Sequence, residues 1–104
     1  MSNHLSIRVR ISQDESLVFD QTFDSMPITI GRSNHCQICL TQYHWISRQH
    51  AVIYPENNRL YLVDLKSVNG IQMGGKTYDR VEIHNGTSVQ IGLLIFKFEL
   101  EQGN

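Results

Sequence analysis

The chain has 104 residues, of which 40% are hydrophobic and 18% are charged. These values are ordinary for one globular domain that buries a core of its own, and they argue against intrinsic disorder. Nine Lys and Arg residues are offset by ten Asp and Glu residues, for a formal net charge of −1 at pH 7. Because the basic residues are scattered rather than gathered in a stripe, we do not expect broad binding to nucleic acid.

The amino-terminal residues and the cysteines bear on the cellular compartment. Residues Met1 to His4 lead into an alternating polar pattern without the apolar core of a signal peptide. No apolar run approaches the roughly 18–20 residues that a membrane helix needs. Cys36 and Cys39 lie too close together for a framework disulfide. We therefore expect residues 1–104 to form a single cytoplasmic domain that does not bind membranes.

Hydrophobic residues recur with the period of two that is typical of strands, and no window has a sustained helical period. Turn signals separate the strands, namely Gln13 to Ser16, Pro55 to Asn58, Gly74-Gly75 and Asn85-Gly86. The pattern predicts ten or eleven short strands, at residues 5–11, 17–23, 28–30, 38–40, 49–54, 60–65, 71–73, 76–78, 81–83, 89–91 and 93–100. An all-β sandwich or barrel follows from this spacing.

Short polar clusters interrupt the strands between Ile30 and Gly70. Gly31-Arg32 follows one expected strand, Ser47-Arg48 precedes another, and Asn69-Gly70 lies in a turn. Because loops at one end of a sheet can aim side chains at a common point, we expect the three clusters to converge.

The residue types in these clusters suit one phosphate group, which carries roughly −1.5 to −2 charge at pH 7 and strong acceptor oxygens. Arg32 offers a planar guanidinium that can donate hydrogen bonds to two phosphate oxygens. Ser47 offers a hydroxyl, and Arg48 offers a second cation. Asn69 offers an amide that can donate to and accept from a peptide backbone at once. His50 is expected to brace the loop through backbone hydrogen bonds rather than to touch the ligand.

Two features of the sequence allow other interpretations. Cys36 and Cys39 form a Cys-x-x-Cys pair near His35, His44 and His50, which is compatible with a small metal or redox protein. The alternation of Ile38 and Leu40 already explains this segment as a strand. Trp45 lies two residues before Ser47, where it either contacts a bound peptide or packs beneath its own loop. No catalytic constellation and no cofactor motif is present, so we expect neither enzymatic activity nor a cofactor.

The ordered set of motifs resembles the forkhead-associated (FHA) family, a β-sandwich that recognises phosphothreonine. The resemblance covers roughly residues 28–92, with the family's order and spacing. The matching segments are Gly31-Arg32, Cys36 to Leu40, Ile46 to Ala51, Asp64 to Gly70, Asn85-Gly86 and Ile91-Gly92. The resemblance to this family implies a sandwich of two twisted, mostly antiparallel sheets with the binding loops at one end.

The resemblance also implies a role for individual residues. Arg32 would pair with phosphate oxygens, Ser47 would donate to the phosphate, and Arg48 would be a second phosphate contact. Asn69 would bind the main chain of the peptide, and Val68 would complete the phosphopeptide-binding set. The residues expected to shape the loops are Gly31, His50 and Gly70.

The sequence departs from the family pattern at a few positions. Val68 stands where Thr or Ser is usual, which removes a hydroxyl donor and makes the site more apolar. Ile71 and Gly74 replace the usual Thr and Asn, and Thr87 replaces the Asp that usually follows Asn85-Gly86; these changes bear mainly on turn geometry.

The expected function is phosphothreonine-dependent recognition of a partner protein or peptide in signalling, with a fused effector domain or a kinase as further expected associates. The first alternative is an FHA-like domain that binds a partner, or itself, without phosphate. The remote alternative is the metal or redox protein based on the cysteines.

Overall fold

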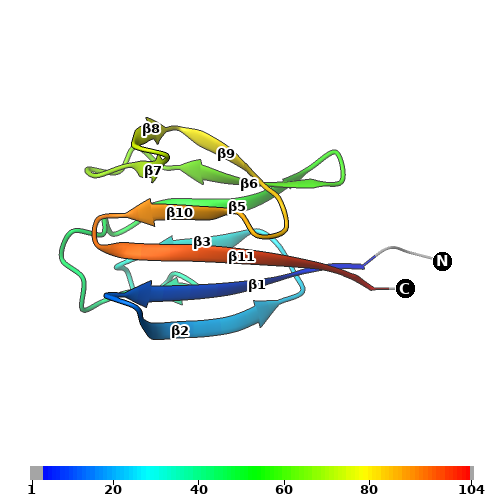
Figure 1. Ribbon diagram of the computed structural model, residues 1–104, viewed down its shortest axis with the longest axis horizontal. Helices are drawn as coiled ribbons and strands as arrows, with labels where there is room; N and C mark the ends of the chain where they lie inside the picture. Colours follow the sequence, from blue (N-terminus) through cyan, green and yellow to red (C-terminus); the bar gives the residue numbers. More distant parts are fainter. Residues whose placement is uncertain (1–3, 104) are drawn as a thin grey trace.

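The computed structural model describes residues 4–103, and its strands form two sheets packed face to face (Figure 1). Residues 1–3 and 104, which belong to the expected domain 1–104, lie outside the described part, as does most of the segment weighed as a signal peptide. The six-stranded sheet has the order β2 (Ser16–Phe23), β1 (His4–Gln13), β11 (Leu94–Gly103), β10 (Ser88–Ile91), β7 (Ile71–Met73) and β8 (Lys76–Tyr78). The five-stranded sheet has the order β4 (Ile38–Cys39), β3 (Ile28–Gly31), β5 (Ala51–Glu56), β6 (Arg59–Asp64) and β9 (Arg80–Ile83).

The all-β sandwich with eleven strands is therefore confirmed, and every sheet pairing is antiparallel except that of β3 with β4. No helix in the described range is long and apolar enough to cross a membrane.

The core lies between the two sheets and follows the period-two pattern of the sequence. In β1 the side chains of Ile7, Val9 and Ile11 are fully buried, and in β11 those of Phe96 and Phe98 are. The alternate residues of each strand face outward, as the pleat of a strand requires. This packing fixes the positions of the loops that leave the strand ends.

The strand ends differ from the prediction mainly around the β5–β6 hairpin. Pro55 and Glu56, expected in the turn, belong to β5, and only Asn57 and Asn58 form the turn, with φ angles of 52° and 62°. Asn tolerates this left-handed conformation better than most residues. Pro55 is accommodated because β3 pairs with β5 only as far as Ile53, so no ladder partner is lost on that side.

The loops that carry the polar clusters lie at the end of the sandwich opposite the chain termini (Figure 1). The strands β3, β6 and β10 all run toward this end, at the left of the view. The long loop between β4 and β5 is hydrogen-bonded to β3 at both of its ends. The Leu40 amide donates to the Gly31 carbonyl at 2.8 Å, and the His50 amide donates to the Ile30 carbonyl at 2.9 Å. Both ends of this loop are therefore held against β3, one on the β4 side and one on the β5 side.

Candidate functional site

All five residues expected to bind a phosphopeptide line one hollow at the loop end of the sandwich. The hollow has a volume of about 290 Å³. Its lining residues are Arg32, His44, Trp45, Ile46, Ser47, Arg48, Val68 and Asn69. The three polar clusters, which are far apart in the sequence, thus meet at one place.

The Arg32 side chain is held in a fixed direction. Its backbone amide donates to the Ser47 carbonyl at 3.0 Å, and its Nε donates to the Ile46 carbonyl at 3.0 Å. Close approach of the two loops depends on Gly31, because a Cβ atom there would lie 2.2 Å from the Arg48 carbonyl oxygen. Neither terminal nitrogen of Arg32 has a hydrogen-bond partner in the described part of the chain, so both are available to an anion.

Ser47 is held by hydrogen bonds that leave its hydroxyl proton free. Its Oγ accepts a hydrogen bond from the Val68 amide at 3.0 Å, so the hydroxyl can still donate to a ligand. Its own amide donates to Nδ1 of His50 at 3.0 Å, and Nε2 of His50 donates to the Gly70 carbonyl at 2.9 Å. The fully buried His50 imidazole therefore ties the Ser47 loop to the Gly70 loop.

Asn69 is exposed and only partly engaged by the protein. Its Nδ2 donates to the Trp45 carbonyl at 2.7 Å, which leaves Oδ1 and the second N–H for a peptide backbone. The loop behind it is fixed by Ser67, whose Oγ accepts from the Gly70 amide at 2.8 Å and donates to Asp64. The amide is thus presented from a rigid turn.

The hollow carries uncompensated positive charge. The arginines outside the hollow each form an ion pair with a carboxylate, namely Arg8 with Asp20, Arg10 with Glu99, Arg59 with Glu82 and Arg80 with Glu56. Arg32 and Arg48 have no such pair within residues 4–103, and no Asp or Glu lines the hollow. A guanidinium left without a carboxylate partner beside a hydroxyl and a carboxamide suits an anionic ligand.

A comparison with protein-family models matches residues 28–92 to the model described as the FHA domain. The chain belongs to the FHA domain family. The match covers the same residues that carry the resemblance in the sequence, so that prediction is confirmed.

Solved structures share the fold of this FHA domain. The FHA domain of CT664 from Chlamydia trachomatis has a TM-score of 0.76 and 23% identity, over 90% of this chain and 96% of that chain. The Slr1951 protein from Synechocystis has a TM-score of 0.78 and 24% identity, over 94% and 97%. A structure from work on phosphothreonine-dependent FHA domain interactions has a TM-score of 0.73 and 21% identity, over 88% and 95%.

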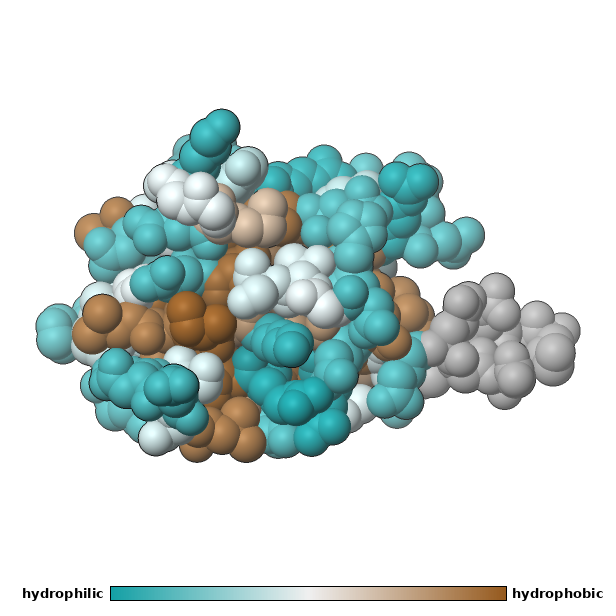
Figure 2. All heavy atoms as spheres, in the orientation of Figure 1, coloured by the Kyte–Doolittle hydropathy of each residue, from teal (hydrophilic) through white to brown (hydrophobic). Residues whose placement is uncertain are grey.

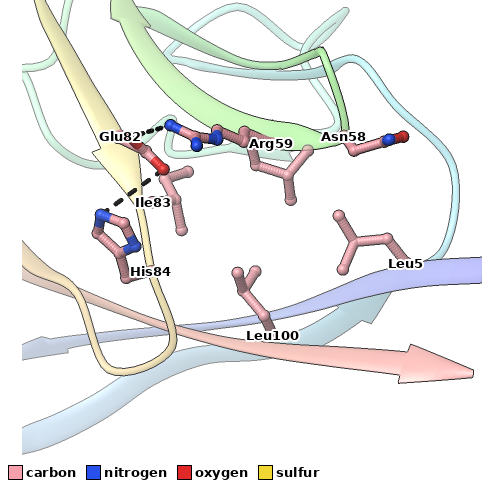
Figure 3. A pocket seen from close by; sticks show the side chains of 8 residues that line it. Leu5, Asn58, Arg59, Glu82, Ile83, His84 and Leu100 are labelled. Carbon is pink, nitrogen blue, oxygen red and sulfur yellow. Dashed lines mark ion pairs between the residues drawn. The ribbon is translucent and has the colours of Figure 1, made fainter.

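A second hollow of this FHA domain, drawn in Figure 3, has a different charge pattern. It has a volume of about 320 Å³ and opens between the two sheets, where Leu5 and Leu100 face Ile83. Its cation, Arg59, lies 3.6 Å from the Glu82 carboxylate, which also lies 3.7 Å from His84. Because its charges compensate one another, this hollow suits a phosphate less well than the one at the loop end.

The placement of Trp45 bears on the two interpretations that the sequence left open. Its half-buried indole packs against the core and so closely over Gly92 that a Cβ atom on that glycine would lie 2.1 Å from the ring. It also lines the hollow. Trp45 therefore packs on the core and on the turn between β10 and β11, and its contact with a bound peptide stays a prediction.

Neither cysteine is among the residues that line the hollow. Cys36 is buried and Cys39 is exposed. Burial raises the pKa of the Cys36 thiol, which opposes formation of the reactive thiolate. Among the residues that the structure describes, no group of three or more His, Cys, Asp and Glu is placed to hold a metal ion.

Two lining residues, His44 and Ile46, were not among the predicted site residues. Ile46 contributes its backbone carbonyl, which holds Arg32, and a backbone role of this kind leaves no signal in the side-chain pattern. His44 is exposed and lies edge-on to Trp45, with the ring centroids 5.3 Å apart. Its place one residue before Trp45 in the polar loop was the signal that could have identified it.

Proposed function

We propose that this FHA domain binds phosphothreonine-containing segments of a partner protein and thereby recruits that partner. The observation that carries the proposal is a pair of arginines, Arg32 and Arg48, that have no carboxylate partner among residues 4–103 and lie beside the Ser47 hydroxyl and the Asn69 amide in one hollow. The structure solved in work on phosphothreonine-dependent FHA domain interactions, which shares this fold, supports it.

The chemistry of binding follows from the free hydrogen-bonding groups. The two terminal nitrogens of Arg32 form parallel charge-assisted bonds to phosphate oxygens, and the Ser47 hydroxyl donates to another. Arg48 adds positive charge at the rim, and Asn69 holds the peptide main chain. Because the Arg32 and Ser47 groups are already held by backbone atoms, little side-chain ordering remains for the moment of binding.

The proposal also concerns the compartment in which the domain acts and the proteins with which it is associated. FHA domains are recognition modules, and we propose that this one has no catalytic activity and acts in the cytoplasm. Its partner would be phosphorylated by a kinase and would be brought to an effector domain or protein with which this module is associated.

The test is a titration of one peptide in three forms, carrying threonine, phosphothreonine or phosphoserine. We expect binding of the phosphothreonine form and none of the unphosphorylated form. Loss of one buried methyl group costs about 0.8 kcal/mol, so phosphoserine should bind about fourfold more weakly. Calorimetry or fluorescence polarisation measures all three affinities, and equal affinity for the threonine and phosphothreonine forms would show a phosphate-independent interaction instead.

Arginine variants assign the binding to this hollow. Charge-assisted hydrogen bonds contribute about 1.5–3 kcal/mol each, so Arg32→Ala should weaken binding about 100-fold or more. Arg32→Lys keeps the charge but loses the planar fork, and should recover only part of the affinity. Arg59→Ala, which removes an arginine at the second hollow, is the control and should bind as the wild type does. Unchanged affinity of Arg32→Ala would place the phosphate elsewhere.

A further inference from the structure

The edge strand β2 has one side of its backbone without a strand partner. It spans Ser16–Phe23, which is eight residues, and it pairs only with β1. Among the described residues, no loop backbone is hydrogen-bonded to its other side. Figure 2 shows hydrophobic residues, in brown, at the lower margin of the molecule, where β2 lies in Figure 1. An open backbone of this kind is a template for pairing with another strand.

The other sheet edges of the described chain are short or charged, whereas β2 is neither. β4 has two residues and β8 has three, so neither offers a ladder of useful length. β9 has four residues and carries Arg80 and Glu82, and charges on an edge strand oppose pairing. β2 has a single charged residue, Asp20, and neither Pro nor Lys. Its first half is also apolar, with Leu17 58% and Val18 40% exposed.

The register of β2 with β1 places an aromatic pair on the core side. Phe19 lies opposite Ile11 and Phe23 opposite Ile7, and both isoleucines are fully buried. Residues directly opposite one another in a sheet share a face, so both phenylalanines point toward the core. Their rings stack with centroids 6.5 Å apart, and both remain partly exposed. Gln21 lies between them in the strand and is exposed.

The outward face of β2 carries its one charge, which is already compensated. Asp20 and Thr22 lie opposite Arg10 and Arg8. The Asp20 carboxylate accepts two hydrogen bonds from Arg8, at 2.8 Å and 2.7 Å. A strand added beside β2 therefore meets no uncompensated charge.

We infer that two copies of this FHA domain pair antiparallel through β2, with the two-fold axis at Gln21, and so join their six-stranded sheets into one. This register sets Phe19 opposite Phe23 of the second copy and Asp20 opposite Thr22 of the second copy. Aromatic cross-strand pairs stabilise a sheet, and a threonine hydroxyl can donate to a carboxylate. The edge thus fits a second copy of itself, because a two-fold contact brings identical strands together antiparallel and β2 is complementary to itself in that arrangement.

Other registers of the same pairing are disfavoured. A register shifted by one residue sets core-side residues of one copy opposite outward residues of the other. An axis at Asp20 sets two Asp20 carboxylates opposite each other, and an axis at Thr22 sets Asp20 opposite Asp24, which is again a pair of like charges. An axis at Phe19 would require Val18, where the register of β2 with β1 is interrupted. The axis at Gln21 avoids all of these conflicts.

The expected contact is small and leaves the binding loops free. One strand from each copy buries less than the roughly 1,200 Å² at which standard interfaces begin, so we expect a transient dimer that depends on concentration. No residue of β2 lines the hollow at the loop end, so both hollows stay open in the pair. If the proposed function holds, the dimer offers two phosphothreonine sites to one partner and gains avidity.

Sedimentation equilibrium of the whole chain, from about 10 µM to about 1 mM, tests the dimer in the range of weak complexes. The mean mass should rise from that of one chain toward that of two. Gln21→Lys sets two ammonium groups opposite each other at the axis and should raise the dissociation constant of the dimer about tenfold or more. Gln72→Lys is the matched control, since Gln72 is exposed on β7, which has a strand on both sides, and it should dimerise as the wild type does. Circular dichroism should show that both variants are folded.

Cysteine variants test the register. In a Cys39→Ser background, which removes the exposed native thiol, Gln21→Cys sets two thiols opposite each other within reach of a disulfide. Thr22→Cys sets each thiol opposite Asp20 instead, and the two thiols are then diagonal neighbours about 7–8 Å apart at the backbone. Diamide oxidises two thiols to one disulfide, so it should crosslink the Gln21→Cys chains at least about tenfold faster, as gel electrophoresis without reductant measures.

The outcomes separate this inference from the proposed function. A wild-type chain that stays monomeric at the highest concentration, a dissociation constant unchanged by Gln21→Lys, or equal crosslinking of the two cysteine variants would overturn the β2 dimer. In solution, Gln21→Lys should bind a phosphothreonine peptide with the wild-type affinity per copy. Absence of that binding in a chain that still dimerises would refute the proposed function and leave the dimer standing.

Discussion

At the scale of single residues, His50 connects the two loops on which the site depends. A neutral imidazole has one donor and one acceptor, and here both are used: Nδ1 accepts from the Ser47 amide and Nε2 donates to the Gly70 carbonyl. The ring is fully buried, so water cannot replace either bond. One side chain thus sets the spacing between the Ser47 hydroxyl and the turn that carries Asn69.

His50→Ala should destabilise the domain by about 3 kcal/mol, because it leaves the part-buried Ser47 amide and the buried Gly70 carbonyl without partners and opens a cavity. His50→Gln, which retains a donor and an acceptor, should cost less. The control is His35→Ala, a change at an exposed histidine, which should unfold like the wild type. Urea denaturation measures the free energies, and an unfolding midpoint for His50→Ala equal to that of the wild type would contradict the bracing role.

At the scale of elements, the loop between β4 and β5 is held by a tight turn and by the packing of the Trp45 indole over Gly92. The Ile46 amide donates to the Tyr43 carbonyl at 3.0 Å, which places His44 and Trp45 at the tip of the turn. The Trp45 indole then packs beside Tyr43, with ring centroids 5.3 Å apart, and over Gly92. The position of Ser47 therefore depends on a hairpin that comes much later in the chain.

Alanine variants of two glycines with the same φ angle separate the packing of Trp45 from backbone strain. Gly92 and Gly74 both have φ of 59°, but a Cβ on Gly92 would meet Trp45 at 2.1 Å whereas one on Gly74 has nothing within 4 Å. Both Ala variants bear the left-handed strain of about 1 kcal/mol, and Gly92→Ala should cost about 1–3 kcal/mol more through overpacking. Urea denaturation of both variants gives the difference.

A double variant checks the cause of that difference. In a Trp45→Ala background the clash is absent, so Gly92→Ala should cost no more than Gly74→Ala does. Peptide binding should fall in Gly92→Ala and persist in Gly74→Ala, because only the former displaces Trp45. If Gly92→Ala lowered the free energy of unfolding by the same amount in the absence of Trp45, contact with the Trp45 ring would not be the reason.

At the scale of the whole molecule, the two sheets share one core, and the chain passes from an edge strand of one sheet directly into an edge strand of the other. β8 belongs to the six-stranded sheet and β9 to the five-stranded sheet, and only Asp79 separates them. The Asp79 carbonyl accepts from the Asp64 amide at 2.8 Å, which joins this crossing to the end of β6. Neither sheet can bury its inner face without the other, so the fold should unfold as one unit.

Trp45 provides the probe for this prediction, since it is the one tryptophan of the sequence. Its fluorescence, which reports the binding loops, and far-UV circular dichroism, which reports the sheets, should give coincident urea transitions. Phe96→Ala, in the core of β11, should lower both midpoints together through a loss of about 3–5 kcal/mol. Separate transitions for the two signals would mean that the loop end unfolds independently of the sandwich.

The strand pattern and the motif residues could be predicted from the sequence because their causes are local. The alternation of Ile7, Val9 and Ile11 marks an inward face whatever that strand packs against. Turn signals such as Gly74-Gly75 depend on the backbone freedom of the residues themselves. The boundary at Pro55 was wrong because β5 keeps pairing with β6 through Pro55 and Glu56, beyond the last residue that pairs with β3, and the residue types alone do not show how far that pairing continues.

The sequence by itself determined the all-β class, the family and the polar residues that carry the proposed chemistry. Only the tertiary structure decided that Arg32 and Arg48 have no carboxylate partner in the described part of the chain while the other arginines do. It also decided that Trp45 holds the Asn69 turn and the Gly92 turn together. The physical reason is that ion pairs and packing contacts join residues brought together by strand register, which depends on the folding of the whole chain.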